Sequence, residues 1–289
     1  MNLGITWPGF KTLLGALLIL GMFAPEIGAV SLEEVKHERH SAVAGMPEFG
    51  RVGKAGQSIL ILRGHLSKTR AKQMQKLASS LHRDVSRRFL KGRDKSGLRP
   101  VDVCLFSSTE AYRKFVSDVI GDDTFHDDLG FYVPYRRLVV ADIERNLGSL
   151  RHELVHVLLR DDLGSVPYWL DEGIASLYVS VKPTKKRLRF VVNYRLNQLR
   201  AARAAGRLPD LKKLASSNDR DVYGSNHQAY YSLAQYLLLY LERQGKLEKF
   251  VRRLLSKPAS PKWQLAVLTQ YIDYKKFLAW TEKLKIETR

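Results

Sequence analysis

Two histidines and a distant glutamate in the middle of the chain have the types and spacing of a metal site. His152 and His156 are four positions apart, and Glu172 follows after fifteen intervening residues. On an α-helix, side chains four positions apart lie on one face, so both imidazoles can bind the same ion. Two neutral nitrogens and one carboxylate are the ligands of a catalytic zinc that keeps its fourth position for water. We therefore predict one Zn2+ ion per chain, bound by these three residues.

Glu153 follows the first histidine directly and is expected beside the ion rather than on it. Zinc lowers the pKa of a bound water to about 7, so a nearby carboxylate can take its proton at neutral pH. The hydroxide that results can attack a carbonyl carbon. We therefore predict Glu153 as the general base of a hydrolytic reaction.

The alternative interpretation of this segment is a core helix with an incidental pair of histidines. Apolar residues such as Leu150, Val155 and Leu158 predict that the helix is largely buried. Ionisable side chains in a buried helix are costly unless they have partners. This cost favours a metal site over the alternative.

The segment after the histidines supports the same prediction. Residues 167–175 have the pattern Pro-x-Trp-Leu-x-Glu-Gly-x-Ala, centred near Glu172. Together with His-Glu-x-x-His, this pattern resembles the gluzincin zinc metallopeptidases, specifically the bacterial peptidase-MA-like domains. The likeness extends upstream to about Gly130 and downstream to about Leu284. It implies an α+β, zincin-like fold, in which a small mixed sheet with helices is followed by a mostly helical C-terminal lobe.

The resemblance also assigns roles to individual residues. It implies that His152, His156 and Glu172 bind zinc and that Glu153 activates water. One position departs from the pattern, because Ser176 stands where the thermolysin branch has an aspartate that orients a histidine. Ser176 is expected to form only a weaker hydrogen bond. The glycine-rich amine-recognition motif of the related aminopeptidases is absent, and this favours an endopeptidase.

The helix predicted from about Ser225 carries candidates for stabilising negative charge on the substrate carbonyl oxygen. In the resembled family, a polar donor lies near the start of this helix. His227 fits that place best by its spacing, and Tyr230 is the second candidate. Tyr231 is a further alternative, and aromatic packing is the alternative role for each of the three.

The first 29 residues differ from the rest of the chain. Lys11 precedes the apolar run Leu13–Ala24, and the small residues Gly28 and Ala29 follow. This order is typical of a secretory signal peptide that is cleaved after Ala29, and it predicts an exported protein, periplasmic or extracellular. The alternatives are an uncleaved membrane anchor and a buried N-terminal helix.

The remainder is predicted to form one body. Residues 30–56 lack a sustained period and are predicted to be a loosely ordered lead-in. Residues 57–289 are predicted to form a single peptidase domain, with an α/β lobe over about 57–160 and a helical lobe over about 165–289. Cys104 is the only cysteine, so no intramolecular disulfide can form, and its apolar surroundings predict a small core residue.

Periodicity and turn residues predict the individual elements. The predicted strands are Ser58–Leu62, Pro100–Phe106, Gly130–Val133 and Arg137–Ala141. The predicted helices are Ser67–Leu90, Thr109–Ile120 with a capping box of Ser107 and Glu110, Trp169–Val179, Asn193–Ala205, Leu247–Leu255 and Trp263–Leu284. In the resembled family, the strand equivalent to Arg137–Ala141 borders the cleft and can pair with an extended peptide. The alternative is that this strand merely closes the sheet.

The chain is strongly basic, with 48 Lys and Arg against 29 Asp and Glu and a formal net charge of +19. This charge favours anionic partners, such as an acidic peptide or an anionic membrane or cell-envelope surface. Segment 173–209 contains nine Lys and Arg and no Asp or Glu, with the highest density at Lys182–Arg189. A solvated face is the alternative. The basic residues are spread out and no nucleic-acid motif occurs, so we do not predict a nucleic-acid partner.

These observations predict an exported zinc metallopeptidase that acts on a peptide or protein substrate. Two alternatives share the same metal centre. The first is a non-catalytic, zinc-containing protein that binds anionic envelope surfaces, and the second is an amidase that acts on a cell-wall bond.

Overall fold

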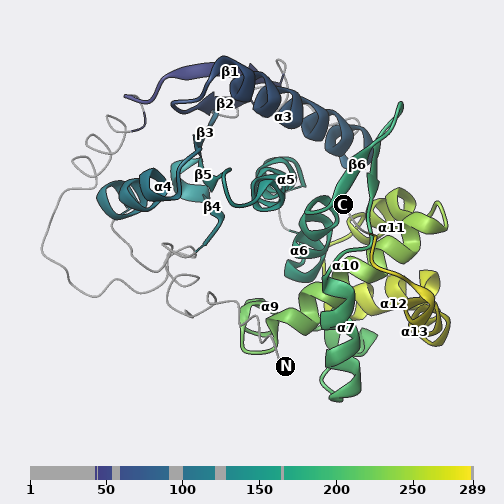
Figure 1. The fold of residues 1–289 in the computed structure, drawn as a ribbon. Coiled ribbons are helices and arrows are strands. Elements are labelled where there is room, and N and C mark those ends of the chain that lie inside the picture. Colours follow the sequence, from purple (N-terminus) through teal and green to yellow (C-terminus); the bar gives the residue numbers. More distant parts are fainter. Residues whose placement is uncertain are drawn as a thin grey trace, which may run out of the picture. The chain divides into compact units, whose positions relative to one another are not determined.

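The computed structural model describes residues 43, 45–53, 59–90, 100–120, 128–163 and 166–287. The predicted signal peptide at residues 1–29 lies outside the described residues. Within the part described, no helix is both long enough and apolar enough to cross a membrane. The fold is mixed α+β (Figure 1).

The described residues form two compact units. The first comprises the described parts of 43–52, 59–75 and 100–150, and the second comprises residue 53, residues 76–90 and the described part of 151–287. Helices α3 (Lys68–Phe89) and α5 (Leu147–Leu163) each begin in the first unit and end in the second.

A small mixed sheet dominates the first unit, as predicted (Figure 1). Its strands are β1 (Glu48–Val52), β2 (Leu60–Arg63), β3 (Val101–Phe106), β4 (Gly130–Val133) and β5 (Leu138–Asp142), and their order is β1-β2-β3-β5-β4. The pairs β2–β3 and β3–β5 are parallel, whereas β1–β2 and β5–β4 are antiparallel. The central strands are largely apolar because side chains on both of their faces are buried.

The position of β5 corrects one prediction. Strand Arg137–Ala141 was expected to border a cleft and pair with an extended peptide. In the structure β5 is an interior strand, since it pairs with β3 on one side and with β4 on the other. Both of its edges are therefore used within the sheet. The alternative, that this strand closes the sheet internally, agrees with the pairing.

The remaining elements of the first unit surround an aromatic core. Helix α4 (Thr109–Phe115) continues into the π-helical turn η1 (Val116–Ile120), and the 3-10 turn η3 (Pro134–Arg136) joins β4 to β5. Cys104 is fully buried in the cluster that contains Tyr112 and Phe131, and burial raises the pKa of its thiol to about 12. The expected capping box is wrong, because the hydroxyl of Ser108, not Ser107, accepts from the backbone N–H of Ala111.

The second unit is mostly helical. After α5 it contains α6 (Tyr168–Tyr178), the hairpin of β6 (Val181–Pro183) and β7 (Leu188–Phe190), α7 (Arg195–Ala204), α8 (Leu211–Ala215), α9 (Asp219–Tyr223), α10 (His227–Arg243), α11 (Leu247–Leu254), α12 (Pro261–Tyr271) and α13 (Tyr274–Lys283). Helices α6 and α10 approach closely at Gly173, where an added Cβ would lie 2.9 Å from Leu238 and 3.0 Å from Ala234. Glycine is needed there because any side chain would push the helices apart.

Some elements differ from the predictions. Strand β1 lies in the lead-in that was expected to be loosely ordered, and β6, β7, α8 and α9 were not predicted. The single helix expected over Trp263–Leu284 is divided into the two helices α12 and α13. The chain turns at Ile272, and the carboxylate of Asp273 caps α13 by accepting from the backbone N–H of Lys276.

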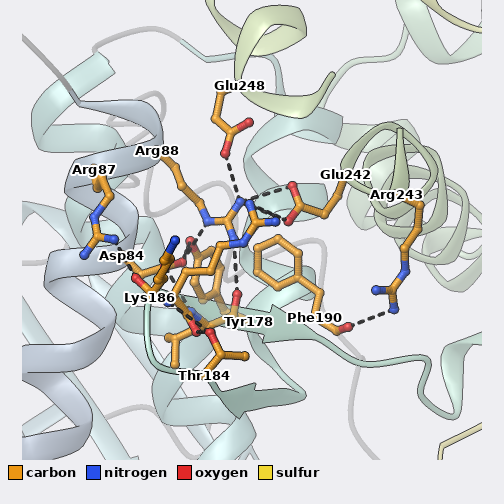
Figure 2. A network of polar contacts seen from close by, with 12 residues as sticks. Asp84, Arg87, Arg88, Tyr178, Thr184, Lys186, Phe190, Glu242, Arg243 and Glu248 are labelled. Atoms are coloured by element: carbon orange, nitrogen blue, oxygen red, sulfur yellow. Dashed lines mark hydrogen bonds and ion pairs between the residues drawn. The ribbon is translucent and has the colours of Figure 1, made fainter. Parts of the chain in front are cut away.

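A buried ion-pair network joins several elements of the second unit (Figure 2). The guanidinium of Arg88, on α3, donates to Asp84 at 2.9 Å, to Glu242 of α10 at 3.1 Å and to Glu248 of α11 at 3.0 Å. It also donates to the backbone carbonyl of Leu188 in β7. Only 3% of the Arg88 side chain is exposed, so each of these contacts offsets the cost of burying its charge.

We expect Arg88→Met to lower the free energy of unfolding by about 3–5 kcal/mol, because it leaves buried carboxylates without their cation. Arg83→Met, at an exposed position of the same helix, is the control and should change it little. Urea denaturation of the two variants and the wild type measures the difference. Equal loss in both variants would contradict a special role for Arg88.

Candidate metal centre

Helices α5 and α6 carry the predicted metal ligands. His152 and His156 lie one turn apart on α5, whose start is capped by the side chain of Asn146. Glu172 lies in the first half of α6, which begins after Pro167. His156 and Glu172 are buried, with 5% and 3% exposed, and His152 is only slightly more accessible. The predicted helical spacing therefore holds.

The three side chains converge. The Nε2 atoms of His152 and His156 are 3.0 Å apart, and the oxygens of Glu172 lie 3.2 Å from the first and 3.5 Å from the second. Ligand atoms at about 2.0–2.2 Å from a tetrahedral ion are about 3.3–3.6 Å apart. The observed separations are close to this range, so the three residues form a group that can hold one metal ion.

The donor chemistry also fits a cation. Two ring nitrogens that face each other at 3.0 Å repel each other through their lone pairs unless a proton or a cation lies between them. Within the part of the chain described, Oε2 of Glu172 forms no hydrogen bond of good geometry although it is buried. The three candidate ligand atoms lie close together, as the ligands of one ion do.

Electrostatics favour a charged carboxylate in this group. Burial alone would raise the pKa of Glu172, but the neighbouring His156 and His152 hold it well below its ordinary value. Burial lowers the pKa of His152. Burial also lowers the pKa of His156. The negative charges of Asp171 and Glu172 have a larger, opposite effect, and the pKa of His156 lies well above its ordinary value.

Asp171 and Arg160 hold His156 in orientation. Oδ1 of Asp171 lies 3.0 Å from Nδ1 of His156, and Nε of Arg160 donates to Oδ2 of the same carboxylate at 3.1 Å. Contacts of this kind to the second ring nitrogen direct Nε2 of a histidine towards a metal. The sequence had suggested Ser176 for this role, but its hydroxyl forms no hydrogen bond within the described residues. The orienting carboxylate instead precedes Glu172 directly.

A second set of hydrogen bonds joins α5 to the other end of α6. Arg151, on α5, donates to the backbone carbonyl of Tyr178 at 2.9 Å and to that of Val179 at 2.6 Å. With Arg160–Asp171, α5 and α6 are therefore joined on both sides of the metal ligands. Arg160 could have been found from the sequence, since residues 152, 156 and 160 recur at four-residue spacing on one helical face.

Two tyrosines complete the surroundings of the ligands. The hydroxyl of Tyr223, at the end of α9, donates to Oε1 of Glu172 at 2.9 Å. The ring of Tyr231, on α10, stacks on His152 with a centroid distance of 6.5 Å and an interplanar angle of 14°. Burial raises the pKa of both phenols well above the ordinary value, and the charge of Glu172 adds to the effect. Both hydroxyls therefore stay protonated and can donate.

The predicted donors on α10 occupy different surroundings. The ring of His227 meets the edge of Tyr231 at a centroid distance of 6.2 Å, and its Nδ1 lies 3.1 Å from the carbonyl of Gly224. The hydroxyl of Tyr230 is buried without a hydrogen bond among the described residues, and burial raises its pKa to about 12. Neighbouring residues of a helix point in different directions, so Tyr231, rather than Tyr230, reaches the histidines.

Glu153 lies on α5 between the two ligand histidines and is half-buried. Its position in the chain agrees with a group beside the ion. Its role as general base stays a prediction.

Arg195, at the start of α7, brings a positive charge to this region. Its guanidinium carbon lies 5.3 Å from the centroid of the Tyr231 ring and 5.7 Å from that of Tyr194. Among the described residues no carboxylate lies within ion-pair distance of it, and its Nε is buried without a hydrogen bond. Its charge contributes to the lowered pKa of His152, so it lies within electrostatic reach of the ligands. In the sequence it is one of the nine basic residues of segment 173–209, and no motif distinguishes it from the others.

No protein-family model matches this chain, and no curated protein sequence matches it.

We expect Asp171→Asn to weaken metal affinity about 10–100-fold, because it removes the charged group that orients His156. Ser176→Ala, a buried change on the same helix, is the matched control and should leave affinity unchanged. Competition with a chromophoric chelator measures both. The opposite ranking would mean that Ser176, not Asp171, supports the ligands.

Proposed function

We propose that this chain is a zinc-dependent metallopeptidase of the gluzincin type that hydrolyses internal peptide bonds. The observation that carries the proposal is the convergence of His152, His156 and Glu172 at separations suited to a single tetrahedral ion. Three protein ligands leave one coordination position open, which distinguishes catalytic from structural zinc sites. When bound, zinc activates water and polarises a carbonyl group.

Glu153 is proposed to accept the proton of the attacking water and to return it to the leaving amine. Its place next to His152 on α5 supports this role. A neutral hydroxyl is proposed to donate to the substrate carbonyl oxygen as negative charge develops there. Tyr231 is the best-supported donor because it stacks on His152, and His227 beside it is the second choice. The position of Tyr230 gives it weaker support.

Arg195 is proposed to select substrates that carry a carboxylate close to the scissile bond. A half-buried guanidinium without a carboxylate partner in the described part of the chain is costly unless an anion completes its environment. The packing of Arg195 over Tyr231, which itself stacks on His152, supports a location near the reaction. The carboxylate would come from an acidic side chain or from the C-terminus of a peptide.

Export remains part of the proposal and rests on residues 1–29 alone. The charge of the chain, +19, supports an acidic substrate or an anionic envelope surface as partner. Neither point depends on the metal centre.

Glu153→Gln should retain zinc and lower turnover of an unfolded protein such as casein about 10²–10⁴-fold, because the amide cannot accept a proton. Elemental analysis and the rate of peptide release measure the two effects, with the exposed Glu282→Gln as control. Wild-type activity in Glu153→Gln would exclude its role as base. One zinc per chain, with no cleavage of proteins or cell-wall amides by the wild type, would favour a non-catalytic binding protein.

Arg195→Met should lower kcat/KM roughly 10–100-fold for a peptide with Glu beside the scissile bond, since one charge-assisted contact is lost. The matched peptide with Gln should be unaffected. Peptides with free and amidated C-termini distinguish the two sources of carboxylate. The control is Arg203→Met, also on α7, whose partner is Glu282. Equal wild-type hydrolysis of the charged and neutral peptides would refute this specificity while leaving the peptidase proposal intact.

A further inference from the structure

A second candidate site lies in the second unit and shares no residue with the metal centre. It is a cavity of about 480 Å³ formed by α3, the turn between β6 and β7, and α11. Five basic side chains line it: Arg87, Arg88, Lys186, Arg187 and Arg252. Only two acidic side chains, Asp84 and Glu248, line it with them. The wall therefore carries an excess of positive charge.

The two carboxylates are already occupied. Asp84 accepts from Nε of Arg88 at 2.9 Å, from the hydroxyl of Tyr178 at 2.8 Å and from the backbone N–H of Leu188 at 3.1 Å (Figure 2). Glu248 pairs with Arg88 at 3.0 Å. Among the described side chains, the ion pairs of both acidic residues of the wall are thus made with the buried Arg88, and neither carboxylate lies within 4 Å of the other four cations.

The four remaining cations have weak partners or none. Figure 2 shows Arg87 reaching the turn that carries Lys186, and there it donates to the backbone carbonyl of Lys186 rather than to a carboxylate. Arg187 is more than half exposed and lies 3.4 Å from Glu242, which also forms an ion pair with Arg88. Within the described residues, the ammonium of Lys186 and the guanidinium of Arg252 have no carboxylate within 4 Å. Like charges gathered around one cavity repel each other unless an anion lies among them.

A neighbouring hollow provides a comparison within the same molecule. It has a volume of about 330 Å³ and is lined in part by Arg189 and Arg243. There Glu287 lies 2.8 Å from Arg189 and 3.8 Å from Arg243, so both cations share an internal partner. Of the four exposed cations of the first cavity, only Arg187 has a carboxylate within 4 Å in the described part of the chain, and that carboxylate, Glu242, is shared with Arg88. This difference selects the first cavity as a site for an external anion.

We propose that the first cavity binds a phosphate group. Guanidinium and ammonium groups that approach from α3, the β6–β7 turn and α11 can donate to several oxygens of one tetrahedral anion. A phosphate can carry two negative charges and offers more acceptor oxygens than a carboxylate. The group belongs either to a free phosphorylated compound or to the headgroup of an anionic phospholipid, and the chemistry of recognition is the same.

Isothermal titration of the zinc-loaded chain with inorganic phosphate, at constant ionic strength, tests the proposal. We expect binding that the double variant Lys186→Ala/Arg252→Ala weakens roughly tenfold or more, because two charged donors are lost. Both residues are exposed, so the variant should keep its fold, which thermal unfolding checks. The control is Lys212→Ala/Arg220→Ala, which removes the same charge from exposed positions of α8 and α9.

Acetate and vesicles complete the experiment. Acetate binding as tight as that of phosphate would overturn the proposed chemistry. Sedimentation with phosphatidylcholine vesicles, with and without phosphatidylglycerol, identifies the source. If the chain binds only the anionic vesicles, and if Lys186→Ala/Arg252→Ala loses this binding while the control variant keeps it, the phosphate belongs to a lipid. If the chain binds neither inorganic phosphate nor anionic vesicles, the site is refuted. Equal loss of binding in both double variants would also refute it, because only general attraction by positive charge would then remain.

Discussion

The approach of Glu172 to two histidines is the constraint on which the site depends. The two imidazole nitrogens are 3.0 Å apart, and the buried Glu172 carboxylate places one oxygen 3.2 Å from the first and the other 3.5 Å from the second. The group is largely shielded from water, and a single proton can satisfy only part of it. A divalent cation satisfies all three lone pairs together. The energetic case for a metal therefore comes from the crowding of donors and not only from their sequence motif.

The fold maintains this crowding by close packing behind the ligands. Gly173 follows Glu172 and, because it has no side chain, lets α6 pack directly against α10, the helix that carries Tyr231. Asp171 precedes Glu172 and faces His156 and Arg160. Three successive residues of α6 thus make an orienting contact, offer a candidate metal ligand and allow close helix packing. A one-residue shift of this helix would disturb all of them.

The sequence predicted the parts of the site that are local. His152 and His156 depend only on helical spacing, and Glu172 belongs to a recognisable segment, so their convergence could be anticipated. Tyr223 could not be, because the short helix α9 has no periodic pattern that indicates which way it faces. The orienting role was placed on Ser176 by resemblance, whereas the choice between Ser176 and Asp171 depends on how α6 is rotated against α5. In the sheet, the strands were predicted, but their order was not, and this order makes β5 an interior strand.

The contacts that join α5 and α6 at both ends have a consequence for metal binding. Arg160–Asp171 joins one end and Arg151 with the carbonyls of Tyr178 and Val179 joins the other, and none of these contacts involves the ion itself. The positions of the candidate ligands are therefore fixed by contacts within the protein, which would reduce the conformational entropy lost on metal binding. A preorganised set of two nitrogens and one carboxylate would discriminate among ions by coordination geometry.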